Sequence, residues 1–427
     1  MNDLNRREFA KAAGMGLAAA SSFYIGTPKG VAGPNDRVRH ATIGIGGQGR
    51  RQSETFQNFD DCEVVAICDI DPSRLADAKK RAPNLEKCRE VGDFREILDD
   101  SSIDTISIAT PDHWHGPIAI MGALAGKHVY VEKPCCHNLN EGRLMVKAAK
   151  KTGKCMQHGT QSRSGRSSRA GIQALQDGII GKVRMAKATN SQLREPIGRA
   201  EPSDPPPGVN YDLWLGPADK TPFTQNRWHY NWHWFWDLGT GDMGNDGTHQ
   251  IDVARWGLGV GTPKAVSASG GQLFYDDDHQ TPDTQVATFE YDDCLLMYEM
   301  RLWADYPLEG FHNGAVFYGD EGTLGIDPRR VVVHKKGEEP KQIADGDSFA
   351  DHPRNFLDAV KANDPSKLTA PIETAFETVT LVHMGNIATR VGDKLHFDSE
   401  ACRFTDNEEA NKLISRHYRE GYELPEV

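Results

Sequence analysis

Short apolar runs alternate with longer amphipathic segments between residues 36 and 158. Runs of this length are typical of buried strands, and the segments between them have the spacing of helices. Strands that alternate with helices predict a parallel, doubly wound sheet that binds its ligand at the carboxyl ends of the strands. The expected strands are 38–45, 63–68, 105–109, 129–132 and 155–158, and the expected helices are 117–125, 139–150 and one that begins at Pro72.

The order of elements changes beyond residue 158. Strands there are expected to follow one another, and two helices come after them. We therefore place one domain at residues 36–158, a second at 159–395 and a C-terminal extension at 396–427. The expected strands of the second domain are 182–195, 264–275, 284–291, 294–302, 313–319 and 330–334, and the expected helices are 350–361 and 372–391.

The composition is that of an ordinary globular protein. The chain has 427 residues, of which 38% are hydrophobic and 26% are charged. That length fits two or three domains, and that balance argues against extensive disorder. The formal net charge of −12 gives no electrostatic reason to bind a nucleic acid. Eight cysteines are too few for a disulfide framework.

The first 33 residues carry charge of the opposite sign. Four basic residues against two acids give them a net +2, so the rest of the chain carries −14. Arg6 and Arg7, followed by an uncharged stretch over residues 12–28, resemble a Tat signal peptide. That stretch is too short and too polar for a stable membrane span. We expect export to the periplasm through the Tat translocase; the alternative is an amphipathic or disordered N-terminus.

A glycine-rich turn follows the first expected strand. Gly44, Gly46 and Gly49, with Gln48 between the last two, form the pattern G-x-G-x-x-G. The first glycine permits a tight turn, the second lets the backbone approach a pyrophosphate, and the third lets the helix pack on the strand. With 42 glycines in the chain the pattern alone is weak. Its position between a strand and a helix favours a dinucleotide site.

An acid stands at the end of the second expected strand. Asp69 follows the glycine-rich turn at the distance where a carboxylate bonds the adenosine ribose and repels a 2′-phosphate. Asp69 therefore favours NAD over NADP, although Arg74 lies near enough in sequence to weaken that preference. The alternative is that Asp69 caps the helix that begins at Pro72.

Several motifs together resemble the Gfo/Idh/MocA oxidoreductase family, over nearly all of residues 36–427. They are the glycine-rich turn, the strand end T-P-x-x-x-H (110–115), the stretch AGKHVYVEKP (125–134) and the later G-x-H-x-I-D-x-x-R-W (247–256). The resemblance implies an α/β protein with an N-terminal Rossmann domain. It also implies an α+β C-terminal domain, whose large and mostly antiparallel open sheet covers the nicotinamide. Residues 396–427 look like the extension of a secreted bacterial subgroup.

The resemblance also assigns catalytic residues. It makes Lys133 the catalytic lysine, which could shuttle protons beside the nicotinamide, with Glu132 holding the ribose or the lysine. His249 matches the histidine that accepts the hydroxyl proton of the substrate, a role that suits an imidazole. Many members carry aspartate four residues before this histidine, where this chain has Asn245. Either Asp246 takes that role through a shifted turn, or Asn245 binds the substrate as a neutral hydrogen-bonding group.

Further residues are assigned to the cofactor or the substrate with open alternatives. His113 is a candidate for substrate contact, and both it and His115 could instead pack at the start of a helix. Gln161 is a candidate nicotinamide partner or a structural loop residue, and Arg163 could meet a substrate anion or lie in solvent. The strand-end residues that the resemblance places at the cofactor are Thr110, Pro111 and His115.

Half of the eight tryptophans lie within residues 228–236. Aromatic rings stack on the faces of sugars, so Trp232 and Trp234 are candidates for substrate contact. The alternative is that at least two of the four belong to the core. His229, His233 and Asp237 have helical spacing for a metal site. Tryptophans at alternate positions favour an extended segment instead, and we expect no metal.

These observations predict an exported, NAD(H)-dependent oxidoreductase that acts on a sugar, glycoside or cyclitol and forms a homodimer or homotetramer. Because an exported enzyme has little free NAD to draw on, the cofactor would stay bound and be regenerated in each cycle. Transhydrogenation between two sugars does this, and so does glycoside cleavage through a 3-keto sugar. A rival class is a non-catalytic sugar-binding protein, which would keep the tryptophans but would not need Lys133.

Overall fold

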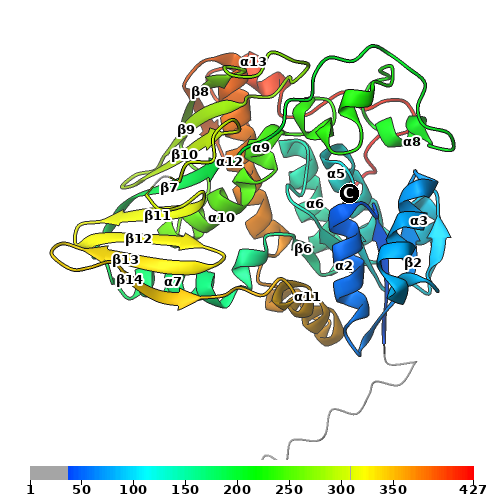
Figure 1. Cartoon of the computed structure of the whole chain (residues 1–427), viewed down its shortest axis with the longest axis horizontal. Coiled ribbons are helices and arrows are strands. Elements are labelled where there is room, and N and C mark those ends of the chain that lie inside the picture. Colours follow the sequence, from blue (N-terminus) through cyan, green and yellow to red (C-terminus); the bar gives the residue numbers. More distant parts are fainter. Residues whose placement is uncertain (1–36, 308) are drawn as a thin grey trace, which may run out of the picture. The chain divides into compact units, whose positions relative to one another are not determined.

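The computed structural model describes residues 37–307 and 309–427 (Figure 1). The predicted signal peptide, residues 1–33, lies outside the described residues and stays a prediction. Residues from Val38 onward form one compact unit that contains two sheets. Within the described part of the chain, no helix is both long enough and apolar enough to cross a membrane.

The first sheet has six parallel strands in the order β3-β2-β1-β4-β5-β6, which confirms the predicted doubly wound sheet. Strand β3 was not expected, because it is only three residues long and two of them are exposed. The strands are β1 (Val38–Ile43), β2 (Cys62–Cys68), β3 (Arg89–Val91), β4 (Thr105–Ile108), β5 (His128–Val131) and β6 (Met156–His158).

Helices connect these strands. They are α2 (Gly47–Gln57), α3 (Pro72–Arg81), α4 (Arg95–Asp99), α5 (Asp112–Leu124) and α6 (Leu139–Thr152). Helix α5 begins five residues before the expected start, because Pro117 lies inside the helix rather than at its first position. The histidines of the 110–115 motif therefore belong to the first turn of a helix.

The second sheet has ten strands in the order β14-β13-β12-β11-β7-β10-β9-β8-β15-β16. It is mostly antiparallel, and β7 and β10 form a parallel pair at its centre, which confirms the expected kind of sheet. The strands are β7 (Val183–Ser191), β8 (Ala265–Gly271), β9 (Thr284–Glu290), β10 (Leu295–Arg301), β11 (Asn313–Gly319), β12 (Gly322–Asp327), β13 (Arg330–Lys335), β14 (Lys341–Asp345), β15 (Leu395–Asp398) and β16 (Arg403–Phe404).

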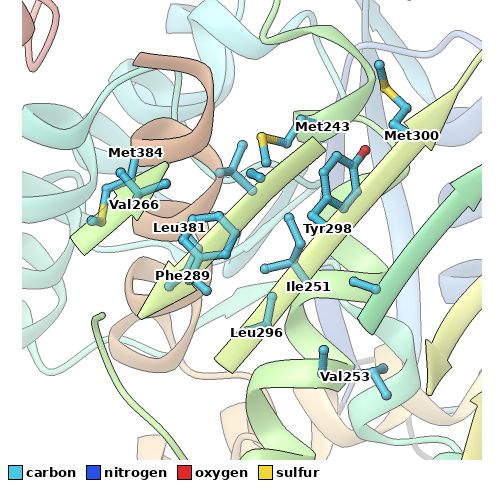
Figure 2. Close-up of a cluster of buried hydrophobic side chains, with 14 of the residues drawn as sticks. Met243, Ile251, Val253, Val266, Phe289, Leu296, Tyr298, Met300, Leu381 and Met384 are labelled. Atoms are coloured by element: carbon cyan, nitrogen blue, oxygen red, sulfur yellow. The ribbon is translucent and has the colours of Figure 1, made fainter. Parts of the chain in front are cut away.

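Helices α10 (Gly247–Leu258) and α12 (Ile372–Val391) pack on this sheet, and α7 (Arg166–Gln176) contacts β12 to β14 (Figure 1). The remaining helices are α8 (Tyr211–Leu215), α9 (Gly241–Gly244), α11 (Asp351–Ala362) and α13 (Glu408–Lys412). Figure 2 shows the core between α10, α12 and the strands. It is built from Met243, Ile251, Val266, Phe289, Leu296, Tyr298, Met300, Leu381 and Met384, all nearly inaccessible.

The start of α10 lies unusually close to the sheet. A Cβ atom added to Gly247 would lie 2.6 Å from the hydroxyl of Tyr298 on β10, so only glycine fits there. Tyr298 is itself fully buried. This contact fixes the first turn of α10, and with it the position of His249 two residues later.

The residues between β7 and α9 (192–240), which we call the roof segment, extend back onto the first domain. The amide of Asn210 donates to the carbonyl of Ile70 (3.2 Å), and the indole of Trp114 on α5 donates to the carbonyl of Leu213 (3.0 Å). His229 contacts the carboxylate of Asp71 (3.0 Å). The C-terminal residues hold the roof segment from the other side, since the buried guanidinium of Arg419 donates to the carbonyls of Gly216 (2.8 Å) and Asp212 (2.7 Å).

Candidate functional site

A cavity of about 590 Å³ lies between the strand ends of the first sheet, the roof segment and the start of α10. Its size is typical of a site for a small molecule or cofactor. Its walls include residues of the glycine-rich turn, both strand-end motifs and α10. Among them are Gly44, Gly46, Gln48, Asp69, Thr110, Pro111, His115, Glu132, Lys133, Gln161, Trp214, Trp228, Tyr230, Trp232, Asn245, Asp246 and His249.

The glycine-rich turn has the geometry that a dinucleotide requires. Gly44 has a φ of +83°, and a Cβ there would lie 2.6 Å from the carbonyl oxygen of Ala109. A Cβ on Gly49 would lie 1.8 Å from the carbonyl oxygen of Gly44, so α2 packs directly on the turn. Around Gly46 there is open space, and no side chain caps the first amides of α2. These amides are available to phosphate oxygens, so the turn fits the pyrophosphate of a dinucleotide.

Asp69 lines the adjoining part of the cavity. Its carboxylate accepts hydrogen bonds from the amides of Ile45 (3.0 Å) and Asp71 (3.1 Å). Burial raises the pKa of Asp69 to about 6 despite these two donors. The cap of α3 is Asp71, whose carboxylate accepts from the amide of Ser73 (2.8 Å), so Asp69 does not have that alternative role.

Three amide side chains converge on Glu132, which is 4% exposed. Its Oε1 accepts from the Nε2 atoms of Gln48 (2.7 Å), Gln52 (2.6 Å) and Gln161 (3.2 Å). Gln161 is therefore more than a structural loop residue, because it follows the last strand of the first sheet and bonds the carboxylate of Glu132 beside Lys133. The hydroxyl of Thr110, also in the cavity wall, is buried and has no partner among the described residues. It is a candidate contact for a bound cofactor.

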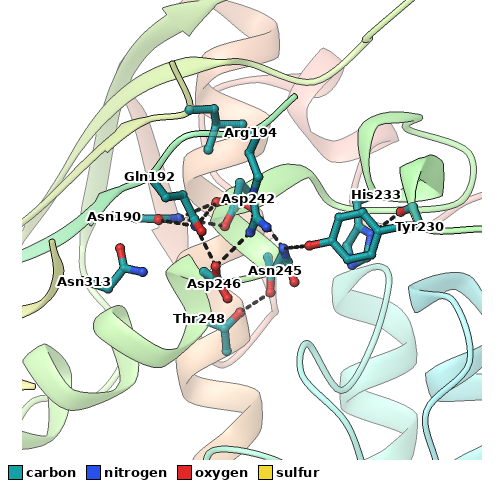
Figure 3. Close-up of polar contacts among 12 residues, drawn as sticks. Asn190, Gln192, Arg194, Tyr230, His233, Asp242, Asn245, Asp246, Thr248 and Asn313 are labelled. Carbon is teal, nitrogen blue, oxygen red and sulfur yellow. Dashed lines mark hydrogen bonds and ion pairs between the residues drawn. The ribbon is translucent and has the colours of Figure 1, made fainter. Parts of the chain in front are cut away.

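Lys133 and His249 lie at the end of the cavity formed by α10. The Nζ atom of Lys133 donates to Oδ1 of Asn245 (2.6 Å). Figure 3 shows the other side of this amide, where Nδ2 of Asn245 donates to Asp242 (2.9 Å) and to the hydroxyl of Tyr230 (3.3 Å). Neither ring nitrogen of His249 has a hydrogen-bond partner within residues 37–307 and 309–427. Burial and the positive charge of Lys133 lower the pKa of His249, so its imidazole is neutral at neutral pH.

Asn245, not Asp246, is therefore the residue that contacts Lys133. Asp246 lines the cavity but pairs with Arg194 (2.8 Å) and accepts from Gln192 (2.6 Å). Burial alone would raise the pKa of Asp246, but Lys133 and Arg194 outweigh it and lower that pKa. Asp246 is ionised and engaged with a cation, whereas Asn245 is the neutral group that touches the lysine.

The sequence did not single out several polar residues at this end of the cavity. Figure 3 shows Asn190 at the end of β7, and Gln192 and Arg194 just beyond it, directed toward Asp242 and Asp246. Their alternate spacing places all three on one face of the chain there, which is a signal that a period of two could have revealed. Tyr230, which lines the cavity, was not singled out either. His233, considered from the sequence only as a possible metal ligand, also lines the cavity, and burial lowers its pKa to about 3.

Three predicted substrate residues are corrected by the structure. His113 is fully buried, and its ring nitrogens contact the carbonyl oxygens of Trp214 (2.8 Å) and Leu238 (3.2 Å). It therefore joins α5 to the roof segment and does not face the cavity. Trp234 is 1% exposed and belongs to the core of the second domain. Arg163 is buried in an ion pair with Asp252 and likewise does not line the cavity.

The other aromatic and histidine predictions have mixed outcomes. His115 lines the cavity and its ring nitrogens contact the carbonyls of Pro134 (2.7 Å) and Thr110 (2.8 Å), so it links the two strand-end motifs. Trp232 lines the cavity and stacks on His233.

The prediction of an extended backbone around the tryptophans is wrong, because residues Asn231–Trp234 form a 3-10 helix. His229 and Asp237, from the possible metal set, pair with Asp71 and Arg227 instead.

The Arg163–Asp252 pair gives a prediction about stability. Asp252 accepts two hydrogen bonds from Nε and Nη2 of Arg163 (both 2.8 Å) and is 1% exposed. Arg163→Met would leave a buried charge unpaired, and we expect the free energy of unfolding to fall by about 3–5 kcal/mol. Chemical denaturation measures this. The exposed Arg169→Met on α7 is the control, and an equal midpoint for both variants would contradict the prediction.

The pH dependence of that contribution follows from the same pair. Burial opposes ionisation of Asp252, but Arg163 outweighs it and lowers the pKa of Asp252. The pair therefore stabilises the fold fully above the pKa of an unfolded aspartate, about 3.9, and the stabilisation is lost as pH falls through the lower folded value.

Two family models match the chain. One, described as oxidoreductase family, NAD-binding Rossmann fold, matches residues 38–160. The other, described as oxidoreductase family, C-terminal alpha/beta domain, matches residues 195–424. Together they cover the first sheet, the second sheet except β7, and the wall of the cavity except Gln161.

Curated relatives and solved structures are similar over different lengths. A glycosyl hydrolase family 109 protein of Shewanella pealeana is 30% identical over 202 residues, which are 42% of this chain and 44% of the relative. A relative of the same name from Shewanella baltica is 29% identical, over 43% of this chain and 45% of the relative. In both cases the matched stretch spans less than half of the relative.

The solved structures match nearly throughout. The aldose-aldose oxidoreductase of Caulobacter crescentus, complexed with glycerol, has a TM-score of 0.67 at 18% identity, and covers 84% of this chain and all (100%) of its own. The WlbA dehydrogenase of Bordetella pertussis, in complex with NADH and UDP-GlcNAcA, has a TM-score of 0.65 at 20% identity. The match covers 85% of this chain and 99% of that protein. At these identities the likeness shows a shared fold.

Proposed function

Because the chain belongs to the Gfo/Idh/MocA oxidoreductase family, we propose that it is an NAD(H)-dependent enzyme that oxidises or reduces a hydroxyl-bearing carbon of a sugar, glycoside or cyclitol. One observation carries the proposal. A single cavity has the glycine-rich turn and Asp69 at one end, and Lys133, Asn245 and His249 at the other. A dinucleotide bound along it with its pyrophosphate at the glycine-rich turn would bring its nicotinamide toward Lys133 and His249.

The residues of the chain divide between holding a cofactor and handling protons. Gly44, Gly46 and the first amides of α2 would hold the pyrophosphate, and Asp69 would hold the adenosine ribose. A bound nicotinamide would supply the hydride acceptor or donor. The neutral His249 can take the hydroxyl proton of the substrate as the carbon is oxidised. Lys133, held by Asn245, is placed to stabilise the developing oxygen charge and pass on the proton.

The charges around this end of the cavity favour a neutral substrate. Lys133 and Arg194 are the cations, and Asp242 and Asp246 lie against them as anions. No surplus positive charge is left there for a carboxylate or phosphate of the substrate. We therefore expect neutral glycosides to react and uronates or nucleotide sugars to react poorly.

We propose that the cofactor stays bound through the cycle. The roof segment covers the cavity with Leu213, Trp214 and Trp228, and it is tied to the first domain and to the C-terminal residues. Opening it to release a dinucleotide would break these contacts. Retention also suits the proposed export through residues 1–33, because a periplasmic enzyme has little free NAD. It is compatible with the homo-oligomer that we propose and equally with a monomer.

Mass spectrometry of the denatured native protein tests retention. We expect NAD(H) to be released in stoichiometric amount from protein purified without added cofactor. Release of no dinucleotide, together with activity only on added NAD, would end the retention proposal while leaving the oxidoreductase proposal in place. A panel of neutral aldoses, cyclitols and 4-nitrophenyl glycosides then identifies the substrate.

The preference for NAD over NADP gives a second prediction. Asp69→Ser would remove the carboxylate that repels a 2′-phosphate, while Arg74 stays in the cavity wall. We expect the Kd ratio of NADPH to NADH to fall by about tenfold or more, since like charges in contact cost several kcal/mol. Fluorescence titration of cofactor-free protein measures both constants. The exposed Asp60→Ser is the control, and an unchanged ratio in Asp69→Ser would refute the assignment.

A second candidate function is glycoside cleavage through a 3-keto sugar. Simple dehydrogenation needs one base, but this cavity also holds the hydroxyl of Tyr230, which is protonated at neutral pH. A sugar oxidised at C3 has an acidic C2 proton. Elimination then expels the aglycone, whose oxygen Tyr230 could protonate, and water addition and reduction at C3 complete the cycle. The relatives named glycosyl hydrolase family 109 favour this candidate.

Turnover in deuterium oxide distinguishes the two candidates. Cleavage by elimination puts deuterium at C2 of the released sugar, whereas transhydrogenation leaves C2 unlabelled and gives oxidised and reduced sugars in equal amounts. Release of 4-nitrophenol without label at C2 would exclude the elimination route.

A further inference from the structure

Asp242 is a buried carboxylate that four side chains surround with donors. Its Oδ1 accepts from Nδ2 of Asn245 (2.9 Å) and from Nη2 of Arg194 (3.1 Å). Its Oδ2 accepts from Nδ2 of Asn190 (2.7 Å) and Nε2 of Gln192 (2.9 Å). The side chain is completely inaccessible, at 0% exposure. A group in this setting cannot touch a ligand, so any effect on the reaction must pass through one of its four neighbours.

One of those neighbours is the partner of Lys133. An asparagine amide can point either its oxygen or its NH₂ group at a lysine, and only the oxygen can accept from the ammonium. Asp242 accepts from the NH₂ group of Asn245 (Figure 3) and so holds the amide with Oδ1 toward Lys133. The 2.6 Å contact between Lys133 and Asn245 therefore depends on the carboxylate of Asp242, which accepts from the other end of the same amide.

Arg194 makes the buried charge tolerable. A buried carboxylate without a counter-charge is strongly destabilising. The guanidinium of Arg194 contacts both Asp242 and Asp246, and Gln192 bridges the same two carboxylates. Burial raises the pKa of Asp242. All four of its hydrogen-bond partners are N–H donors, however, and none offers an oxygen to which a protonated carboxyl could donate. The carboxylate is therefore ionised at neutral pH.

We propose that Asp242 is a positioning residue that sets Lys133 through Asn245, with Arg194 as its counter-charge. The negative charge of Asp242 does not touch the lysine, and the neutral amide of Asn245 transmits its orientation. The role in turnover rests on the proposed function, whereas the orientation of Asn245 can be tested without any substrate.

Asp242→Asn is the decisive variant. Asparagine removes the negative charge, and its single oxygen can accept from only one of the two donor pairs, Asn245 with Arg194 or Asn190 with Gln192, so the hold on the amide of Asn245 weakens. Because a displacement of about 1 Å at a reacting group can cost about 10²-fold, we expect kcat to fall by about 10- to 100-fold. KM for the sugar and the Kd for NADH should stay near wild-type, since Asp242 touches neither.

Asp283→Asn is the matched control. Asp283 is also a fully buried carboxylate of the second domain, and it accepts from the amides of Leu273 (3.1 Å), Phe274 (2.9 Å) and Tyr275 (2.9 Å), away from the cavity. Its replacement should lower stability and leave kcat unchanged. A loss of kcat in Asp283→Asn equal to that in Asp242→Asn would mean that buried carboxylates act only through stability, and would overturn the proposal.

The exchange variant Asp242→Asn/Asn245→Asp tests the mechanism directly. The exchange keeps one negative charge between positions 242 and 245. The asparagine at position 242 can then donate to the carboxylate at position 245, which accepts from Lys133. Asn245→Asp alone sets two carboxylates against each other and should be impaired. We expect the exchange to recover most of the kcat lost by either single variant, whereas an exchange no better than the worse single variant would overturn the proposal.

A crystal structure of Asp242→Asn gives a result that does not depend on activity. We expect the distance from Nζ of Lys133 to the side chain of residue 245 to exceed the hydrogen-bond limit of about 3.5 Å. A contact retained at the wild-type distance would overturn the proposal. If the wild-type enzyme turns over no sugar in the panel, the proposed function fails, but this distance still decides the role of Asp242.

Discussion

Replacing Lys133 by alanine is expected to lower kcat by about 10²–10⁴-fold, the range that a positioned acid–base group contributes. The Nζ atom of Lys133 is held by Asn245 at 2.6 Å in the wall of the cavity, beside His249. Alanine removes the proton carrier and the positive charge that would stabilise the oxygen of the substrate. Steady-state kinetics on the sugar found in the panel measures the loss.

Two further variants make this result specific. Lys133→Met keeps most of the volume of the side chain without its charge, so it should lose as much activity as Lys133→Ala with less disturbance of packing. Lys147→Ala removes an exposed lysine of α6 and should behave as wild-type. Unchanged turnover of Lys133→Ala on every sugar that the enzyme processes would refute the catalytic role and favour a sugar-binding protein.

Replacing His249 by asparagine is expected to cause a loss of similar size, about 10²–10⁴-fold in kcat, because it removes the neutral base. The pH profile of the wild-type enzyme should report the same group. Since burial and Lys133 lower the pKa of His249, protonation needs a pH below the ordinary histidine value of about 6.5. The rate of oxidation should therefore be level near neutral pH and fall only in more acidic solution.

The acid limb of this profile can be assigned with one control. His334 is exposed on β13, and His334→Gln should leave both the rate and the profile unchanged. The residual activity of His249→Asn should no longer fall along the wild-type acid limb. A wild-type limb centred above about 6.5, or one that persists in His249→Asn, would assign the base to another group.

The sequence alone supported both predictions to the same extent. Lys133 and His249 lie in motifs whose residues are close together in the chain, so the resemblance could assign both. Their convergence on one cavity, and the contact that joins Lys133 to Asn245 across 112 positions of sequence, come from the structure. Asp242 has no motif of its own, and only its contacts reveal that it lies behind Asn245.

Side-chain direction was the main thing that the sequence could not supply. His113 and His115 are two positions apart at the start of α5, yet one is buried against the roof segment and the other lies in the cavity wall. Trp232 and Trp234 differ in the same way, because a 3-10 helix replaces the expected extended backbone. Arg163 looked available for a substrate, but its partner Asp252 lies 89 positions away in sequence.

The sequence by itself determined the class of fold and the type of site, because both follow from local patterns. Short apolar runs predict most strands of the first sheet, a longer apolar segment places helix α12 at residues 372–391, and the glycine spacing predicts a turn that fits a dinucleotide. Short or exposed strands such as β3 and β14 carry no such period and were missed. Only the tertiary structure decided which polar side chains meet, because the roof segment, the end of β7 and the C-terminal residues reach the cavity through contacts between distant parts of the chain.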